Sequence, residues 1–240
     1  RDPFRNFNVY KIDPLTEIRN AGIVTNGQVY WVSSVSDSDH RQRTDDLGNT
    51  YVKTGIQAAI DMVETDQNDY VLVVPTDGGT SRALSEGINI NEDRVHVLGL
   101  GYKPAPMSYN GLTFVGYATA SPTVTDTELV NVTGAGVELG GLRFLGTAGT
   151  NDNGTITNLL LLGTASSGTA HDFWAHDLTV EANLAAAHGA GVANTVRITG
   201  DVGAGISGIR FDRCWLGHWS WAPAAVVSMA GTAGPTRPEF

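Results

Sequence analysis

Two kinds of short apolar segment alternate through the second half of the chain, and their spacing constrains the fold more than any other feature. The first kind follows an eight-residue pattern: apolar, any, apolar, any, any, Leu or Ile, any, aromatic or Val. The four copies are Val95, Val97, Leu100 and Tyr102; Val137, Leu139, Leu142 and Phe144; Phe173, Ala175, Leu178 and Val180; and Ala204, Ile206, Ile209 and Phe211. Their Leu or Ile positions are 42, 36 and 31 residues apart.

The second kind of segment consists of four apolar stretches whose central residues repeat at steps of 30, 36 and 30. The stretches are Leu129–Val132, Leu159–Leu162, Thr195–Ile198 and Ala225–Ser228, with Val130, Leu160, Val196 and Val226 as markers. From the Leu or Ile of copies two to four, the next marker follows after 18, 18 and 17 residues, but from Leu100 only after 30. Either the loop Gly101–Asn110 is an insertion, or the first copy is Met107, Tyr109, Leu112 and Phe114.

A fixed spacing between two strand types, repeated four times, predicts stacked coils in which each strand pairs with its counterpart in the next coil. The predicted fold is mainly β, a right-handed parallel β-helix with neighbouring strands about 4.8 Å apart. Leu142, Leu178 and Ile209 are expected to point inward and stack. The alternative is a β-sandwich of short antiparallel strands, which does not require equal paired spacings.

The first part of the chain has a different character. Residues 1–27 are expected to form an N-terminal arm, residues 28–90 lead-in strands and a capping helix, and residues 91–240 the coils and a C-terminal cap. Gln28–Val32 and Tyr70–Val74 read as strands. Between them, Ile56, Ala59, Ile60 and Val63 form one apolar stripe, which predicts a helix over residues 55–64. Thr54 and Gln57 have capping-box spacing at its start, and the helix is expected to end near Thr65.

Composition narrows the possible partners. The formal net charge is −10, which disfavours binding to nucleic acids and to anionic membranes. No apolar run approaches the length of a membrane span. The single cysteine, Cys214, excludes an intramolecular disulfide and is expected to be a small buried residue on a strand.

Three carboxylates could form an enzymatic site. Glycan-cleaving enzymes use paired carboxylates, and Asp177, Glu181 and Asp212 could lie on neighbouring coils. The competing interpretation is that they are outward polar positions joined by salt bridges between coils, such as Arg210 with Asp177. The second interpretation is favoured, so no catalytic residue is assigned.

His171 and His176, with Asp172 and Asp177, could be read as metal ligands. However, side chains five residues apart on a strand point to opposite faces, so no metal and no cofactor is predicted.

Trp215, Trp219 and Trp221 concentrate three of the five tryptophans within seven residues. We expect them to close the end of the coil stack or to pack against another subunit; stacking on a sugar is the alternative.

The order of these elements resembles the pectate-lyase-like β-helix proteins of tailed bacteriophages. The resemblance covers roughly residues 28–216 and is carried by Thr54–Ile60, by Tyr70–Pro75 and by Val95–Gly101. It implies a non-enzymatic virion structural protein, a homotrimeric capsid decoration or head-fibre protein on the head surface, in contact with capsid or other virion proteins. The alternatives are a tail spike that binds or cleaves host polysaccharide, and a free-standing lyase or glycosidase.

Overall fold

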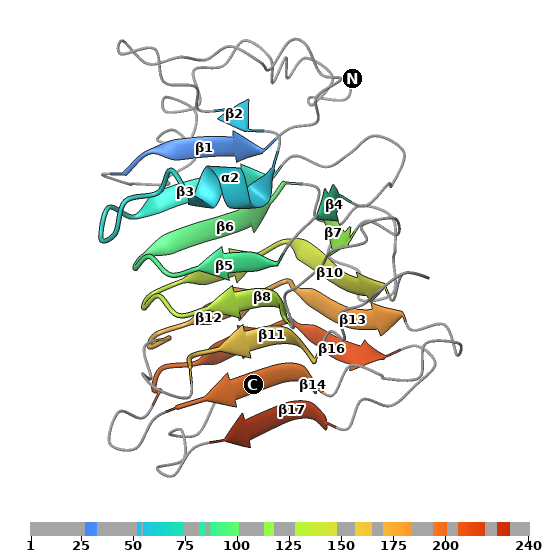
Figure 1. The fold of residues 1–240 in the computed structure, drawn as a ribbon. Coiled ribbons are helices and arrows are strands. Elements are labelled where there is room, and N and C mark those ends of the chain that lie inside the picture. Colours follow the sequence, from blue (N-terminus) through green and yellow to red (C-terminus); the bar gives the residue numbers. More distant parts are fainter. Residues whose placement is uncertain are drawn as a thin grey trace, which may run out of the picture.

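The computed structural model describes the chain in separate segments. They are residues 27–32, 52–53, 55–73, 82–84, 87–100, 113–117, 128–147, 157–164, 170–183, 194–200, 206–218 and 225–230. Only the backbone is described for residues 52–53, 82–84, 113–117, 145–147, 181–183, 218, 225–226 and 230. This part of the chain is mainly β, and its strands form three parallel sheets (Figure 1).

Each sheet is built from strands that lie far apart in the sequence. The first sheet has the order β15 (Arg210–Asp212), β12 (Trp174–His176), β9 (Glu138–Gly140), β6 (Val95–Gly99), β3 (Asp69–Val73), β1 (Val29–Val32) and β2 (Val52–Lys53). The second has the order β16 (Trp215–His218), β13 (Thr179–Asn183), β10 (Leu142–Thr147), β7 (Thr113–Tyr117) and β4 (Arg82–Leu84). The third has the order β17 (Ala225–Ala230), β14 (Asn194–Thr199), β11 (Asn158–Leu162), β8 (Glu128–Val132) and β5 (Ile88–Ile90).

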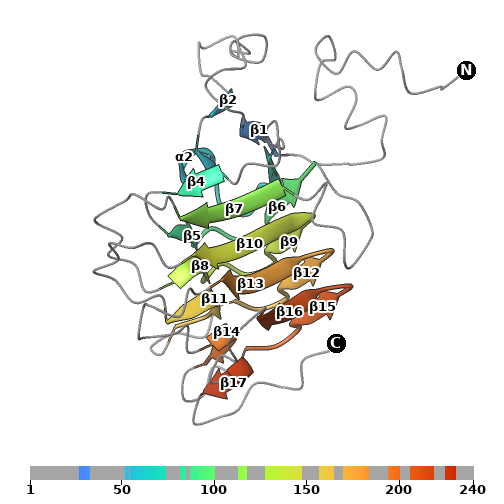
Figure 2. The ribbon, with the colours of Figure 1, turned by 90° about the vertical axis from the view of Figure 1, so that its right-hand side faces the viewer.

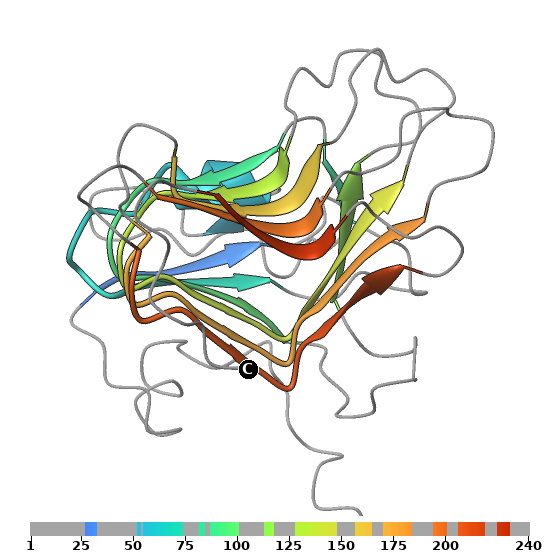
Figure 3. The same ribbon diagram turned by 90° about the horizontal axis from the view of Figure 1, so that it is seen from below.

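The chain visits the three sheets in turn. From β3 onward, each strand pairs in parallel with the strand three places later, so that five sets of three strands stack, from β3–β4–β5 to β15–β16–β17. We call each set a rung. Figure 2 shows the strands of the second sheet stacked in this order, and Figure 3 shows the three sheets around a common interior. Because the pairing among the described strands is parallel, the antiparallel β-sandwich alternative is wrong.

The interior is filled by columns of apolar side chains in register. In the first sheet one column comprises Tyr30, Val71, Val97, Leu139, Ala175 and Phe211, all of them buried. Leu142 and Leu178 stack in the same way, because their following residues Arg143 and Thr179 are paired, and both are buried as predicted. Columns of this kind let each rung bury the apolar face of the next.

The fourth copy of the pattern, predicted at Ala204–Phe211, was placed five residues too early in the sequence. Thr179 pairs with Trp215, so the residue beside Leu178 is Cys214, and the stacking of Ile209 on Leu178 is wrong. Ile209 is buried, but it precedes Arg210, which pairs with Trp174, and it therefore lies beside Phe173. The reason is that Cys214 occupies the position held by Leu142 and Leu178 in the two preceding rungs. Cys214 is half-buried and lies between β15 and β16, not on a strand.

The first copy is correct at Val97, which pairs with Leu139, but not at Leu100 and Tyr102. Thr113 pairs with Leu142 and Val115 with Phe144, so the alternative copy ending in Leu112 and Phe114 is one residue out of register. The insertion is confirmed and is slightly longer than expected: residues 100–112 separate β6 from β7, where Gly141 alone separates β9 from β10. In the third sheet the partner of Val196 is Val227, so the marker Val226 was also one residue out.

Helix α2 (Ile56–Ile60) confirms the apolar stripe, since Ile56, Ala59, Ile60 and Val63 are buried. The helix ends at Ile60 rather than near Thr65, because the N–H groups of Met62 and Val63 bond to the third preceding carbonyl, not the fourth, which tightens the chain into a turn. The capping box is wrong: Gly55 is the N-cap, without a side-chain hydrogen bond.

The Gln57 amide instead accepts from the backbone N of Asn89 at 2.7 Å and donates to its carbonyl at 3.2 Å. It therefore takes the place of a neighbouring strand at the edge of β5. The turn that follows the helix is bound to β1, because the Tyr30 hydroxyl donates to the Met62 carbonyl at 2.8 Å.

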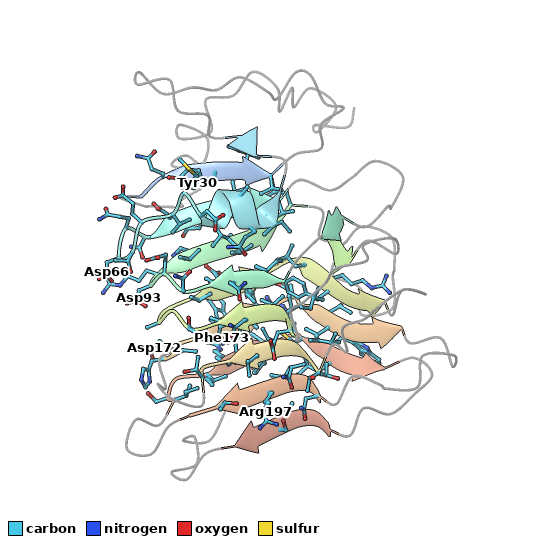
Figure 4. The ribbon with its side chains drawn as sticks, in the orientation of Figure 1. Tyr30, Asp66, Asp93, Asp172, Phe173 and Arg197 are labelled. Carbon is cyan, nitrogen blue, oxygen red and sulfur yellow. The ribbon has the colours of Figure 1, made fainter. Side chains whose placement is uncertain are left out.

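The turns that lead into the first sheet repeat one backbone conformation from rung to rung. Arg94, Gly136, Asp172 and Gly208 all have φ between 55° and 72°. Asp66, Asp93 and Asp172 mark this edge of the stack in Figure 4. Aspartate and glycine tolerate the left-handed conformation, which allows the chain to turn within one or two residues. The expected arm falls outside the described residues except for Gly27, and so do Trp219 and Trp221.

Candidate functional site

The outer face of the first sheet carries a column of polar and aromatic side chains. Tyr70, His96, Glu138, Trp174 and Arg210 are consecutive partners across β3, β6, β9, β12 and β15. Each follows or precedes a buried interior residue such as Val97 or Leu139, so strand alternation turns these side chains outward. A second outward column, two residues further along, ends with Gly140, His176 and Asp212.

Glu138 joins the two columns. Its Oε2 lies 2.5 Å from Nδ1 of His96, and its Oε1 lies 2.8 Å from Nε2 of His176. The other face of this cluster is aromatic: the rings of Tyr70 and His96 stack with centroids 4.3 Å apart, and Trp174 lies 4.5 Å from the His176 ring. Glu138, on β9, thus connects the side chains of two neighbouring strands, His96 on β6 and His176 on β12.

His176 extends the chain of contacts to the corner between the first and second sheets. Its Nδ1 lies 3.0 Å from Oδ2 of Asp177, and Asp177 accepts two hydrogen bonds from Arg213, at 2.6 and 2.8 Å. We call His96, Glu138, His176 and Asp177 the histidine–carboxylate chain. Both ring nitrogens of His176 face carboxylate oxygens. A neutral imidazole has one N–H, so only the doubly protonated ring donates to both.

The charges of this chain stabilise one another. Burial raises the pKa of Glu138, but the hydrogen bonds and charges of His176 and His96 outweigh it and lower the pKa to about 2. The hydrogen bond to Glu138 raises the pKa of His176 against the effect of burial, and Asp177 raises it further. Burial and the charge of Glu138 raise the pKa of Tyr70.

Gly140 makes room for this arrangement. A Cβ atom at Gly140 would overlap Cε1 of His176 and would lie 2.5 Å from its Nε2. The imidazole therefore lies directly over the glycine backbone, and only the absence of a side chain there lets it reach Glu138.

Two of the three carboxylates named from the sequence come together. Asp177 and Asp212 both contact Arg213, whose guanidinium lies 3.6 Å from Asp212 Oδ2 at its Nη1. A salt bridge between rungs at Asp177 exists, but the partner is Arg213 and not Arg210, which instead lies 3.2 Å from Asp212. Arg213 follows Asp212 in a left-handed turn at φ 51°, which brings its side chain back over the preceding rung. Glu181 pairs with Gly217 in the second sheet, and its side chain lies outside the described atoms.

Trp215 does not close the end of the stack. Leu216 continues the interior column of Val180, so Trp215 points outward from the second sheet, where it is 45% exposed. Its ring lies against Gly217, with Nε1 and Cε2 at 3.1 and 3.6 Å from where a Cβ would be. The predicted capping role is wrong for Trp215, and a contact with another subunit stays a prediction.

His171 and His176 have different partners. Nδ1 of His171 accepts from the Ser207 backbone N at 3.2 Å, away from Glu138. Among the described residues, no group of three His, Cys, Asp or Glu side chains is arranged to hold a metal ion.

His96, Glu138 and Trp174 were not identified from the sequence, because they become neighbours only through the register. His96 and Glu138 are 42 residues apart, which equals the spacing between Val97 and Leu139. The spacing of the interior residues therefore also predicts that His96 and Glu138 are neighbours, because each precedes an interior residue by one position.

Comparison of the chain with protein-family models, curated proteins and solved structures finds no match. In the part of the chain that the structure describes, no helix has the length and apolar character needed to cross a membrane.

Proposed function

We propose that the chain is a right-handed parallel β-helix and a non-enzymatic structural protein of a virus particle, a homotrimeric decoration or head-fibre protein. The fold assignment is supported by the five stacked rungs and by the general right-handedness of parallel crossovers. The resemblance of Tyr70–Pro75 and Val95–Gly101 to phage β-helix proteins supports the role.

The observation that carries the non-enzymatic role is the pairing of the carboxylates. A glycosidase needs one protonated and one ionised carboxyl group on either side of an accessible substrate. Asp177 is instead held by two hydrogen bonds from Arg213 and one contact with His176, and its side chain is 11% exposed. These groups stabilise one another and leave Asp177 little access to a substrate.

Association is supported by large apolar side chains on the surface. Leu100, Trp215 and Met229 are each more than two-fifths exposed. A symmetric trimer would cover such positions.

The particle itself provides the test. Locating the chain in a density map of the intact virion should place three copies around a common axis on the head. Sedimentation of the purified protein should give the mass of three chains. A monomer in solution that is absent from the particle would contradict the proposal.

A receptor-binding tail spike is the second candidate, and the exposed indole of Trp215 favours it. One face of the ring lies on Gly217, which leaves the other free to stack on a sugar. Purified protein should be incubated with host envelope polysaccharide, together with Trp215→Ala and with a triple variant carrying Asp177→Asn, Glu181→Gln and Asp212→Asn. Binding that Trp215→Ala abolishes, or product release that the triple variant abolishes, would replace the structural role by the tail spike.

A further inference from the structure

We propose that the histidine–carboxylate chain is a proton-dependent clasp, which holds the outer face of β6, β9, β12 and the β12–β13 turn together while His176 is doubly protonated and loosens when it loses a proton.

The geometry requires two protons on His176. Glu138 Oε1 lies 2.8 Å from Nε2, and Asp177 Oδ2 lies 3.0 Å from Nδ1. After one proton leaves, one ring nitrogen becomes an acceptor that faces a carboxylate acceptor without a hydrogen between them. That contact changes from an attraction to a repulsion, so the ring must give up either Glu138 or Asp177.

The contacts join strands rather than neighbours along the chain. Glu138 and His176 lie on β9 and β12, His96 lies on β6, and Arg213, which holds Asp177, follows β15. Giving up Glu138 separates the outer side chains of β9 and β12. Giving up Asp177 leaves that carboxylate bound to Arg213 alone, so it can move with the last rung independently of His176.

The surroundings favour the closed, protonated form. The charged or titratable side chains around His176 are Tyr70 on β3, His96 on β6, Glu138 on β9, Asp177 at the β12–β13 turn, Arg210 and Asp212 on β15, and Arg213 after it. The two carboxylates in direct contact raise the pKa of His176. A raised pKa means that the stabilisation is complete below the ordinary histidine value of 6.5, as long as Glu138 stays ionised, and is lost as the pH rises through the raised pKa of His176.

His171 is a matched internal control. It belongs to the same rung, but its Nδ1 lies 3.2 Å from both the backbone N and the Oγ of Ser207, so its partner is neither Glu138 nor Asp177. A substitution at His171 therefore leaves the contacts of the histidine–carboxylate chain in place.

The experiment is a titration of the full chain labelled at its histidines, followed by NMR. In the unaltered protein, we expect His176 to titrate above 6.5, the ordinary value for histidine. Glu138→Gln removes the charge, and Gly140→Ala displaces the ring without altering any titratable group. Both should lower the midpoint of His176 by about one pH unit. Gly55→Ala is the control, because the nearest side-chain atom to the added methyl group is 3.9 Å away.

Hydrogen exchange tests the opening itself. The Asp177 amide donates to the Asp212 carbonyl at 3.0 Å, and the Trp174 amide to the Val137 carbonyl at 2.9 Å. After correction for intrinsic exchange, their protection should fall as the pH rises through the His176 midpoint. The fall should be absent in His176→Gln and present in His171→Gln. An unshifted His176 midpoint, or protection that does not follow it, would overturn the clasp. Neither result depends on the role of the protein in a virus particle.

Discussion

The two faces of the first sheet use the same strands in opposite ways. The inner column, from Tyr30 to Phe211, contains apolar side chains of several sizes that need only fill space. The outward side chains change from stacked rings, at Tyr70 and His96, to an ion pair between Glu138 in the first outer column and His176 in the second. Apolar packing is non-directional, whereas each outer contact depends on one atom meeting another. The inner face therefore sets the stability of the stack, and the outer face makes part of it depend on pH.

The largest expected effect is on the inner face. Leu178→Ala should lower the free energy of unfolding by about 2–5 kcal/mol, because a fully buried side chain leaves a cavity that the rungs above and below cannot fill. Leu98→Ala is the matched control, since Leu98 points outward from β6 and is only partly buried. Urea denaturation of both variants measures the difference. Equal losses would contradict the division between the faces.

An intermediate effect is expected at Glu138, and it depends on pH. Its pKa is lowered from 4.5 to about 2, so its stabilisation is complete above pH 4.5 and is lost as the pH falls toward 2. This difference corresponds to about 3 kcal/mol. Thermal denaturation between these pH values should show a steep loss for the unaltered protein and a shallower one for Glu138→Gln. The variant Glu64→Gln, at an exposed position, should retain the full slope.

The smallest effect is expected at the rim of the outer face. Arg213 donates two hydrogen bonds to Asp177, but its side chain is 62% exposed, so solvent screens the pair. Arg213→Ala should cost less than about 1 kcal/mol, and the loss should shrink further in about 1 M salt. Arg213→Lys keeps the charge but not the paired hydrogen bonds, so its free energy of unfolding should lie between those of the unaltered protein and Arg213→Ala. A loss as large as that of Leu178→Ala would show that the rim carries part of the core's stability.

The sequence predicted the inner face much better than the outer one. Val97, Leu139 and Ala175 recur because every rung must bury them, and apolar recurrence is visible in a sequence. The prediction lost the register where a rung departs from that rule. Cys214 takes the place of a leucine in the last copy, and 13 residues intervene between β6 and β7. A shift of one residue turns a strand over, so the outer neighbours could not be identified where the register was lost.

The candidate site could also be predicted only in part, because the apolar repeat does not show every contact. Asp177 and Asp212 were named together and do lie close, since Asp212 pairs with His176, the residue before Asp177, but the arginine that joins them was not identified. Arg213 reaches Asp177 only because its own backbone adopts a left-handed conformation, φ 51°, which is uncommon for arginine and not visible in the apolar pattern.

The corner between the first and second sheets has a practical consequence for engineering. Gly141 alone joins β9 to β10, whereas residues 100–112 join β6 to β7, and the strands on both sides keep their parallel partners in either case. The length of the connection at this corner is thus independent of the register that it connects. A foreign peptide inserted between β6 and β7 should leave the ladder intact, which makes this corner the natural place to display an epitope on the surface of the protein.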